Sequence, residues 1–360
     1  MRREEIIHNV IKLKHNKAGN RRGVSGPDSR DLGAILLFIF LLPYMVSFFF
    51  GHTGSGGTAK EGEAVEGYQM EEGLFQEVWE EAEFIICSRT GAGMEVMPME
   101  TYLLNRLPAT IDTGYEIEAL KAQAVILRTE LIRKYQDALK AGEELEQIGG
   151  KPCIYIEDRL IAVDGNRYDK CREAVEETEG MYLIRDRYPV KAPYFAVSAG
   201  TTRNGSEALP EEEYAYLKAV VCNRDFTSPE YTQSIQLGKK AFIEGLQELI
   251  VKYTGQSGVK LEMDNLVSQL NLTRDSSGYV TEVGIGEISI SGESFRAAFS
   301  LPSSCFELEE GKDFLGINTK GVGHGLGISQ YGANEMAKKG SDFIDILGYY
   351  FLDAVIERLK

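Results

Sequence analysis

Residues 32–51 form an uninterrupted apolar run, and this run constrains the chain more than any other sequence feature. The segment LGAILLFIFLLPYMVSFFFG contains no charged side chain. A helix of this length spans ~30 Å, the thickness of a bilayer's hydrocarbon core, and a buried helix of a soluble domain seldom lacks polar residues for so long. A cleaved signal peptide is the main alternative, but the preceding segment is long and no A-x-A-like site precedes His52. We therefore expect a transmembrane signal anchor.

The charges on the two sides of this run indicate its orientation. Residues 1–31 contain eight Lys and Arg residues against four Asp and Glu residues, whereas the whole chain has a formal charge of −16. Basic residues before a span keep that side in the cytoplasm, so the bulk of the chain should be extracytoplasmic. An acidic part without a basic stripe is a poor partner for nucleic acid, and we expect no nucleic-acid binding.

The remaining chain is expected to have α+β architecture. After the cytoplasmic segment 1–31 and the span 32–51, the Gly-rich residues 52–84 are typical of a tether, and 85–360 should form one large exported domain. Short β-branched and aromatic segments without regular βαβ alternation favour α+β. The expected strands are CIYIE, MYLIR, PYFAV, YLKAVV, YVTEVGIG and EISIS, all between Cys153 and about Phe299.

The clearest helix is expected after Asp112. Thr113 and Glu116 have the spacing of a capping box, and apolar residues then recur every three or four positions. Gly142 should end this helix. Further helices are expected at about 238–255, at 331–339 and from Ser341.

The cysteines do not determine a disulfide pattern. Their number is odd and no C-x-x-C pair occurs, so one or two bridges are possible but their pairing stays open. Too few histidines accompany them for a zinc site of ordinary spacing, and we expect no metal and no cofactor. The five positions are Cys87, Cys153, Cys171, Cys222 and Cys305.

A glycine-rich segment near the C-terminus is the first candidate site. In GVGHGLGISQYGA, residues 321–333, glycines at alternate positions surround His324 and permit close approach of a ligand or a strand. Ser329 and Gln330 follow at the expected start of a helix. Taken alone, the segment is equally consistent with a tight crossover that contains a structurally satisfied histidine.

Four motifs in order resemble the stage II sporulation protein D (SpoIID) and LytB amidase-enhancer family. They are EALKAQAV, the S-x-G-x-T segment at Ser198, SGESFRAAFSLPSSCFEL and GVGHGLGISQYGANEMAKKG. The resemblance covers roughly residues 90–360. It implies a membrane-anchored sporulation protein that cleaves peptidoglycan glycan strands by lytic transglycosylation, together with a cell-wall amidase and other engulfment membrane proteins.

One position departs from the family pattern at the point where chemistry is expected. The family places its catalytic Glu eight residues after the Tyr of E-x-Y and eight before the Glu of EALKAQ, and this chain has Thr110 there. A threonine hydroxyl does not titrate near neutrality and cannot protonate a glycosidic oxygen at a useful rate. The resemblance therefore leaves two hypotheses open. Either another carboxylate, from Asp112, Glu100 or Glu116, supplies the acid, or the chain binds glycan and stimulates an amidase without cleaving.

We expect a substrate groove where the helix near Glu116 meets the His324 loop. Donors on the helix should face sugar hydroxyls, and a tyrosine should offer a stacking face. Thr110 should lie at the floor of this groove. The expected substrate-binding residues are Lys121, Gln123, Arg128, Tyr194, Ser198, His324, Ser329 and Gln330.

Overall fold

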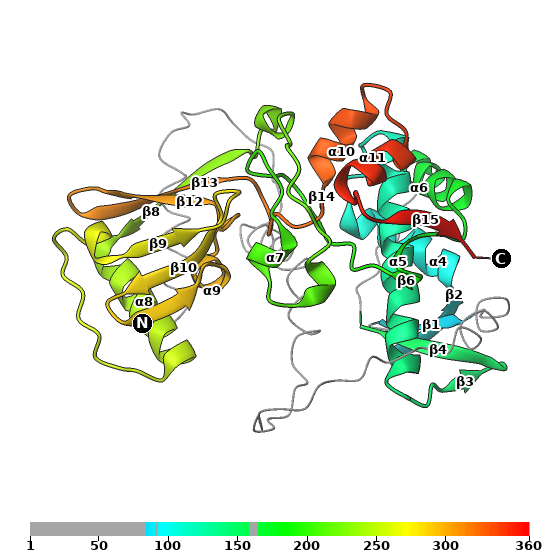
Figure 1. Ribbon diagram of the computed structural model, residues 1–360, viewed down its shortest axis with the longest axis horizontal. Helices are drawn as coiled ribbons and strands as arrows, with labels where there is room; N and C mark the ends of the chain where they lie inside the picture. Colours follow the sequence, from blue (N-terminus) through cyan, green and yellow to red (C-terminus); the bar gives the residue numbers. More distant parts are fainter. Residues whose placement is uncertain (1–83, 91–92, 158–164, 360) are drawn as a thin grey trace, which may run out of the picture. The chain divides into compact units, whose positions relative to one another are not determined.

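A computed structural model describes residues 84–90, 93–157 and 165–359, and its mixture of helices and strands confirms the α+β class (Figure 1). The predicted cytoplasmic segment, the span 32–51 and nearly all of the tether lie outside these residues. Within the described ranges, no helix combines the length and the apolar character needed to cross a bilayer. We expected one large domain, whereas the described chain divides into two compact units.

The larger unit, here called the α5 unit, contains described residues from 84–231, 274–279 and 324–359. Its helices are α4 (Met99–Thr110), α5 (Ile117–Lys140), α6 (Gly165–Glu177), α7 (Gly205–Ala208), α10 (Gln330–Ala337) and α11 (Phe343–Tyr350), with 3₁₀ turns at Glu212–Tyr214 and Asp225–Thr227. Its strands are β1 (Ile85–Thr90), β2 (Gly93–Pro98), β3 (Gln147–Ile148), β4 (Lys151–Ile156), β5 (Met181–Arg185), β6 (Tyr188–Pro189), β7 (Tyr194–Phe195), β14 (Ile328–Ser329) and β15 (Val355–Arg358).

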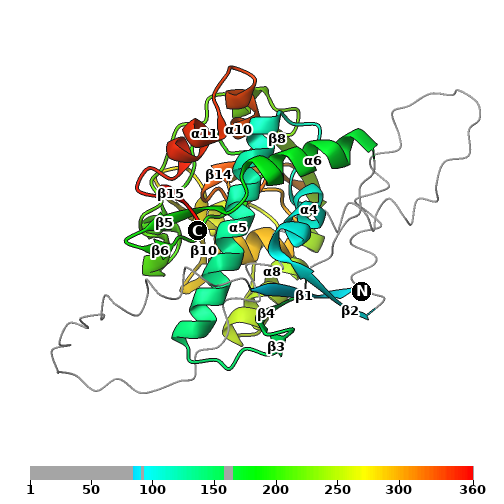
Figure 2. The ribbon, with the colours of Figure 1, turned by 90° about the vertical axis from the view of Figure 1, so that its right-hand side faces the viewer.

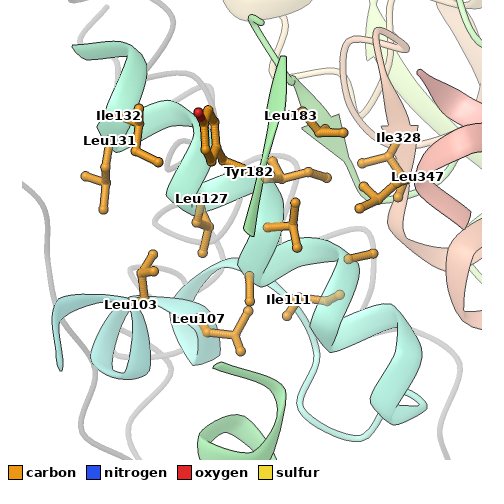
Figure 3. Packing of buried hydrophobic residues seen from close by; sticks show 14 of the residues in the cluster. Leu103, Leu107, Ile111, Leu127, Leu131, Ile132, Tyr182, Leu183, Ile328 and Leu347 are labelled. Atoms are coloured by element: carbon orange, nitrogen blue, oxygen red, sulfur yellow. The ribbon is translucent and has the colours of Figure 1, made fainter. Parts of the chain in front are cut away.

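Helix α5 forms the centre of this unit. Figure 2 shows it between the region of α4 and β1 on one side and β5 and β6 on the other. The strands form a sheet of order β2-β1-β4-β3, a second sheet of order β15-β5-β6, and a short parallel pair of β14 with β7. Leu127 and Leu131 of α5 pack with Leu103 and Leu107 of α4, as Figure 3 shows. This apolar core fixes the ends of α4 and α5, which carry the candidate site.

The predicted helix after Asp112 is confirmed, but its predicted capping box is wrong. The helix begins at Ile117, and no side chain caps it from position 116. The backbone N–H of Glu116 instead donates to Asn334 Oδ1 of α10 at 2.8 Å, so a distant side chain satisfies the donor that a capping box would serve. The C-terminal prediction is confirmed, since Gly142 has φ +69° directly after the cap residue.

The smaller unit, here called the insert unit, contains residues 232–273 and 280–323. Its core joins aromatic rings such as Phe242, Phe295 and Phe306. The strand orders are β12-β13-β8 and β11-β10-β9. Its elements are β8 (Thr232–Gly238), α8 (Lys239–Thr254), a 3₁₀ turn (Val267–Gln269), β9 (Asn271–Arg274), β10 (Val280–Ile285), β11 (Ile288–Ser291), α9 (Gly292–Ala298), β12 (Phe306–Glu310) and β13 (Phe314–Lys320).

One expected strand is absent from the described structure. YLKAVV, residues 216–221, forms an irregular segment with a single isolated bridge from Val221 to Thr201. Its backbone bonds go to the facing loop instead of a ladder: Val220 N–H donates to Thr202 Oγ1, and Leu217 C=O accepts from Gly205 N–H. Tyr216, Leu217 and Val220 of this segment are buried without belonging to a strand, so their apolar character did not indicate one.

The cysteine pairing left open by the sequence is resolved for one pair. Cys87 of β1 and Cys153 of β4 form a disulfide. The two strands are parallel neighbours, and their pairing sets Ile85 opposite Cys153. The bridge therefore ties the first strand of the α5 unit to the segment that follows α5. Among the described residues, Cys171 and Cys222 are buried free thiols.

Candidate functional site

Thr110 is the last residue of α4, and its side chain is engaged by its own helix. Its Oγ1 donates to the carbonyl of Leu107 at 2.9 Å, and the chain leaves the helix at Ile111 in an extended conformation. The residue is half-buried. The position at which the family resemblance predicts an acid is thus occupied here by a neutral hydroxyl bonded to the backbone.

Two buried glutamines join this position to α5 and α10. Gln330 Nε2 donates to the carbonyl of Thr110 at 2.7 Å and to Gln123 Oε1 at 3.1 Å. Both amides are almost fully buried. Gln123 Nε2 has no hydrogen-bond partner in the part of the chain that the structure describes. The structure therefore brings three predicted site residues together, from segments up to 220 positions apart in the sequence.

The glycine-rich segment provides the close backbone approach that its sequence predicts. A Cβ at Gly325 would lie 2.5 Å from the ring of Tyr279, and a Cβ at Gly327 would lie 2.0 Å from the carbonyl oxygen of Pro193. Both glycines also have positive φ, at +79° and +75°. Only glycine fits either position without displacement of a neighbour.

His324, within this segment, is half-buried. Its Nδ1 accepts from the Leu326 N–H at 3.1 Å, so the neutral ring carries its proton on Nε2. The ring packs at a tilt on Phe195, with 5.7 Å between centroids. Its carbonyl accepts from Arg203 Nη1 at 3.4 Å. Tyr194, the expected stacking residue, is half-buried in the β7–β14 pair beside Phe195.

A buried carboxylate that sequence reasoning missed links Ser198 to Ser329. Asp225 Oδ2 accepts from the Ser198 N–H and from Ser329 Oγ, each at 2.6 Å. Ser329 Oγ in turn accepts from the Gly332 N–H at 3.2 Å and caps α10. Burial raises the pKa of the Asp225 carboxyl, although these hydrogen bonds act in the opposite direction. Asp225 is thereby a positioning residue for the helix end from which Gln330 reaches Thr110.

Arg128, which we expected in the groove, is fully buried and paired. Its Nε and Nη2 donate to the two carboxylate oxygens of Glu100 at 2.7 and 2.6 Å, and its Nη1 donates to the Met181 carbonyl at 3.0 Å. The guanidinium thus joins α4 to β5 inside the unit and presents no face to solvent. Glu100, one alternative acid, is the counter-charge of Arg128.

The Lys121 ammonium also pairs with neighbouring carboxylates. Its Nζ lies 2.6 Å from Glu118 and 2.5 Å from Glu177, and its side chain is only 11% exposed. The ammonium therefore stabilises the contact between α5 and α6. The expectation that Lys121 and Arg128 offer donors to a groove finds no geometric support in these contacts.

The surface beside Thr110 is built around Tyr115. Burial raises the pKa of Tyr115 to about 12, and the carboxylates of Asp112 and Glu230 and the ring of Tyr331 add to this shift. Asp112 is exposed, and its Oδ1 accepts from the Gly114 N–H at 2.8 Å. Glu230 is also exposed, and no sequence motif indicated that it lies near this surface. We call Tyr115, Asp112, Glu230 and Tyr331 the acidic rim.

In the α5 unit, the central helix is bonded through its neighbours to a glycine-rich loop and to the N-terminus of α10. The model of the family described as "SpoIID: Stage II sporulation protein" matches residues 89–184. The family resemblance that the motifs predict is confirmed over these residues.

Full-length relatives support the same assignment. The chain is 28% identical to stage II sporulation protein D of Bacillus subtilis, over 89% of this chain and 92% of that protein. It is 29% identical to the protein of that name from Bacillus amyloliquefaciens, over 72% and 74% of the two chains. It is also 23% identical to the amidase enhancer of Bacillus subtilis, over 68% of this chain but only 39% of that longer protein.

Proposed function

We propose that this chain is a membrane-anchored sporulation protein that binds peptidoglycan glycan strands and stimulates a cell-wall amidase during engulfment. The observation that carries this proposal is Thr110 at the position of the family's acid. Its hydroxyl donates to the Leu107 carbonyl and has no proton to give at neutral pH. The scaffold around it, from Gln123 to Gln330, is nevertheless intact.

Lytic transglycosylation explains why this one position matters. A single carboxyl group must protonate the glycosidic oxygen and then accept a proton from the sugar's 6-hydroxyl, which closes an anhydro ring. Such a group needs a raised pKa, and in general acid–base catalysis it contributes about 10²–10⁴-fold to the rate. Without it, the same surface retains its capacity to bind a sugar chain.

The location is proposed from the sequence, with support from one structural feature. The apolar run 32–51 is long enough to span a bilayer, and the basic residues before it favour a cytoplasmic N-terminus. The Cys87–Cys153 disulfide is typical of a domain on the oxidising side of the membrane. Relatives named for sporulation and for amidase enhancement agree with a role at the cell wall.

Glycan cleavage is the second candidate function, and the acidic rim favours it. Asp112 and Glu230 both lie close enough to Tyr115 to raise its pKa. Either carboxylate is a candidate to replace the missing acid. Glu100 is a weaker candidate for this role because both of its carboxylate oxygens accept hydrogen bonds from Arg128.

Digestion of purified, peptide-free glycan strands separates the two functions. The full-length protein should bind the strands and release no anhydro-sugar product. Thr110→Glu should create cleavage, with Thr101→Glu as a matched control because Thr101 is an exposed threonine on the same helix. Cleavage by the wild-type protein would overturn the non-catalytic proposal. Loss of that cleavage in Asp112→Asn or in Glu230→Gln would then identify which carboxylate is the acid. An absence of glycan binding would overturn both candidates.

A further inference from the structure

A pocket of about 310 Å³ opens in the α5 unit. The loop 221–225, α10, the residues after it and α11 form its walls. The lining residues that the argument uses are Val221, Asn223, Arg224, Met336, Ser341 and Tyr349. Its volume lies within the range of about 300–1,000 Å³ that is usual for small-ligand sites.

Arg224 dominates the electrostatics of this pocket. The residue is half-buried, and its Nη1 donates to the Glu335 carbonyl at 3.1 Å, which anchors the guanidinium beside α10. Asp225 also lines the pocket; its side chain is fully buried, its Oδ2 is engaged by two serines, and its Oδ1 has no hydrogen-bond partner among the described residues. Burial raises the pKa of this carboxyl above its ordinary value, and it raises the pKa of the Cys222 thiol to about 12. Arg224 is therefore the group of the lining that can pair with an anionic ligand.

The remaining lining combines apolar walls with a few polar groups. Val221 is 54% exposed and Tyr349 is 38% exposed, and the Tyr349 hydroxyl donates to the Val221 carbonyl. Met336 adds a flexible apolar wall, while the Asn223 amide and the Ser341 hydroxyl supply hydrogen-bonding groups. A ligand that suits all of these has a carboxylate, an amide and a small apolar group close together.

We propose that this pocket binds the carboxyl end of a short peptide. The terminal carboxylate pairs with Arg224, whose fork of N–H groups matches a carboxylate in a bidentate manner. The last side chain packs against Val221 and Tyr349, and the amide of Asn223 bonds the adjoining peptide group. A carboxylate-bearing sugar presents hydroxyls on most of its faces, so it would leave the apolar walls unmatched. This site is separate from the proposed function and does not depend on it.

Calorimetric titration of the full-length protein in mild detergent tests the proposal. The probe is N-acetyl-alanyl-alanine, and the comparison ligand is the same dipeptide with a C-terminal amide. The acid should bind at least about tenfold more tightly than the amide, a factor equal to about 1.4 kcal/mol. Arg224→Gln should reduce the affinity for the acid to that for the amide. Arg172→Gln is the matched control, because Arg172 is an exposed α6 arginine that pairs with Asp169.

A second variant keeps the test valid if Arg224→Gln disturbs folding. Val221→Trp narrows the exposed mouth of the pocket and should weaken both dipeptides while leaving the Arg224 side chain in place. Equal binding of the acid and the amide to the wild-type protein would overturn the proposal, as would an absence of binding by either dipeptide. Tighter binding of N-acetylmuramic acid than of the dipeptide acid would show that the site recognises a sugar carboxylate, and would also overturn it.

Discussion

Removal of the Glu100 carboxylate should destabilise the α5 unit, because it leaves the Arg128 guanidinium buried without its counter-charge. The Arg128 side chain is fully buried, whereas Glu100 is 28% exposed. Each charge-assisted hydrogen bond between them contributes ~1.5–3 kcal/mol, and loss of one partner from a buried pair costs ~3–5 kcal/mol. Because water can enter from the Glu100 side, we expect the lower end, about 3 kcal/mol, for Glu100→Ala. This corresponds to a roughly hundredfold larger equilibrium constant for unfolding.

Amide hydrogen exchange of peptides from α5 measures this loss within the correct unit. A chain with two compact units need not unfold in one step, so a single melting temperature would mix their stabilities. Asp169→Ala is the matched control, because it breaks the Arg172–Asp169 pair, whose side chains are 50% and 63% exposed. That change should alter the exchange free energy of α5 by less than about 0.5 kcal/mol. A loss below about 1 kcal/mol for Glu100→Ala would refute the assignment of Arg128 as a buried structural cation.

Three further perturbations test other parts of the α5 unit. Burial raises the pKa of folded Asp225 above its ordinary 3.8, so stability should fall as the pH rises from that value through the folded pKa. Asp225→Asn should remove this fall from urea titrations at several pH values. Gly332→Ala would set a Cβ 2.3 Å from the Tyr350 hydroxyl and should cost ~1–3 kcal/mol, whereas Gly348→Ala meets open space and should stabilise α11 by up to ~1 kcal/mol; amide hydrogen exchange of peptides from α10 and α11 measures both. Reduction of Cys87–Cys153, which closes a loop with a sequence separation of 66, should cost ~4 kcal/mol in urea titrations, and the double alanine variant should no longer respond to reductant.

Local patterns in the sequence predicted the elements whose signals are local. The apolar period after residue 116 predicted α5, and alternate glycines predicted the tight backbone approach at Gly325 and Gly327. The segments MYLIR and EISIS became β5 and β11. In each case the residues that determine the conformation are neighbours in the chain, so periodicity and glycine placement were sufficient.

Contacts between distant segments could not be predicted in this way. Asp225 carries no motif, and its function as a link depends on Ser198 and Ser329, which lie 27 and 104 positions away. Arg128 looked like a surface donor because charged helix residues are usually exposed, and only the position of Glu100 explains its burial. The capping box failed for the same reason, since Asn334 reaches the helix start from 218 positions away.

The way in which Gln330 holds the end of α4 explains how residue 110 can change without loss of the contacts around it. Gln330 binds the backbone carbonyl of residue 110, and the side chain of that residue takes no part in the joint. The Thr110 hydroxyl bonds only within its own helix turn. A substitution at position 110 therefore changes the chemistry offered to a substrate while the contact between α4, α5 and α10 is preserved. For this reason Thr110→Glu should fold as the wild-type protein does. Any cleavage that this variant gains can then be attributed to the new carboxyl group, because the scaffold is not rearranged.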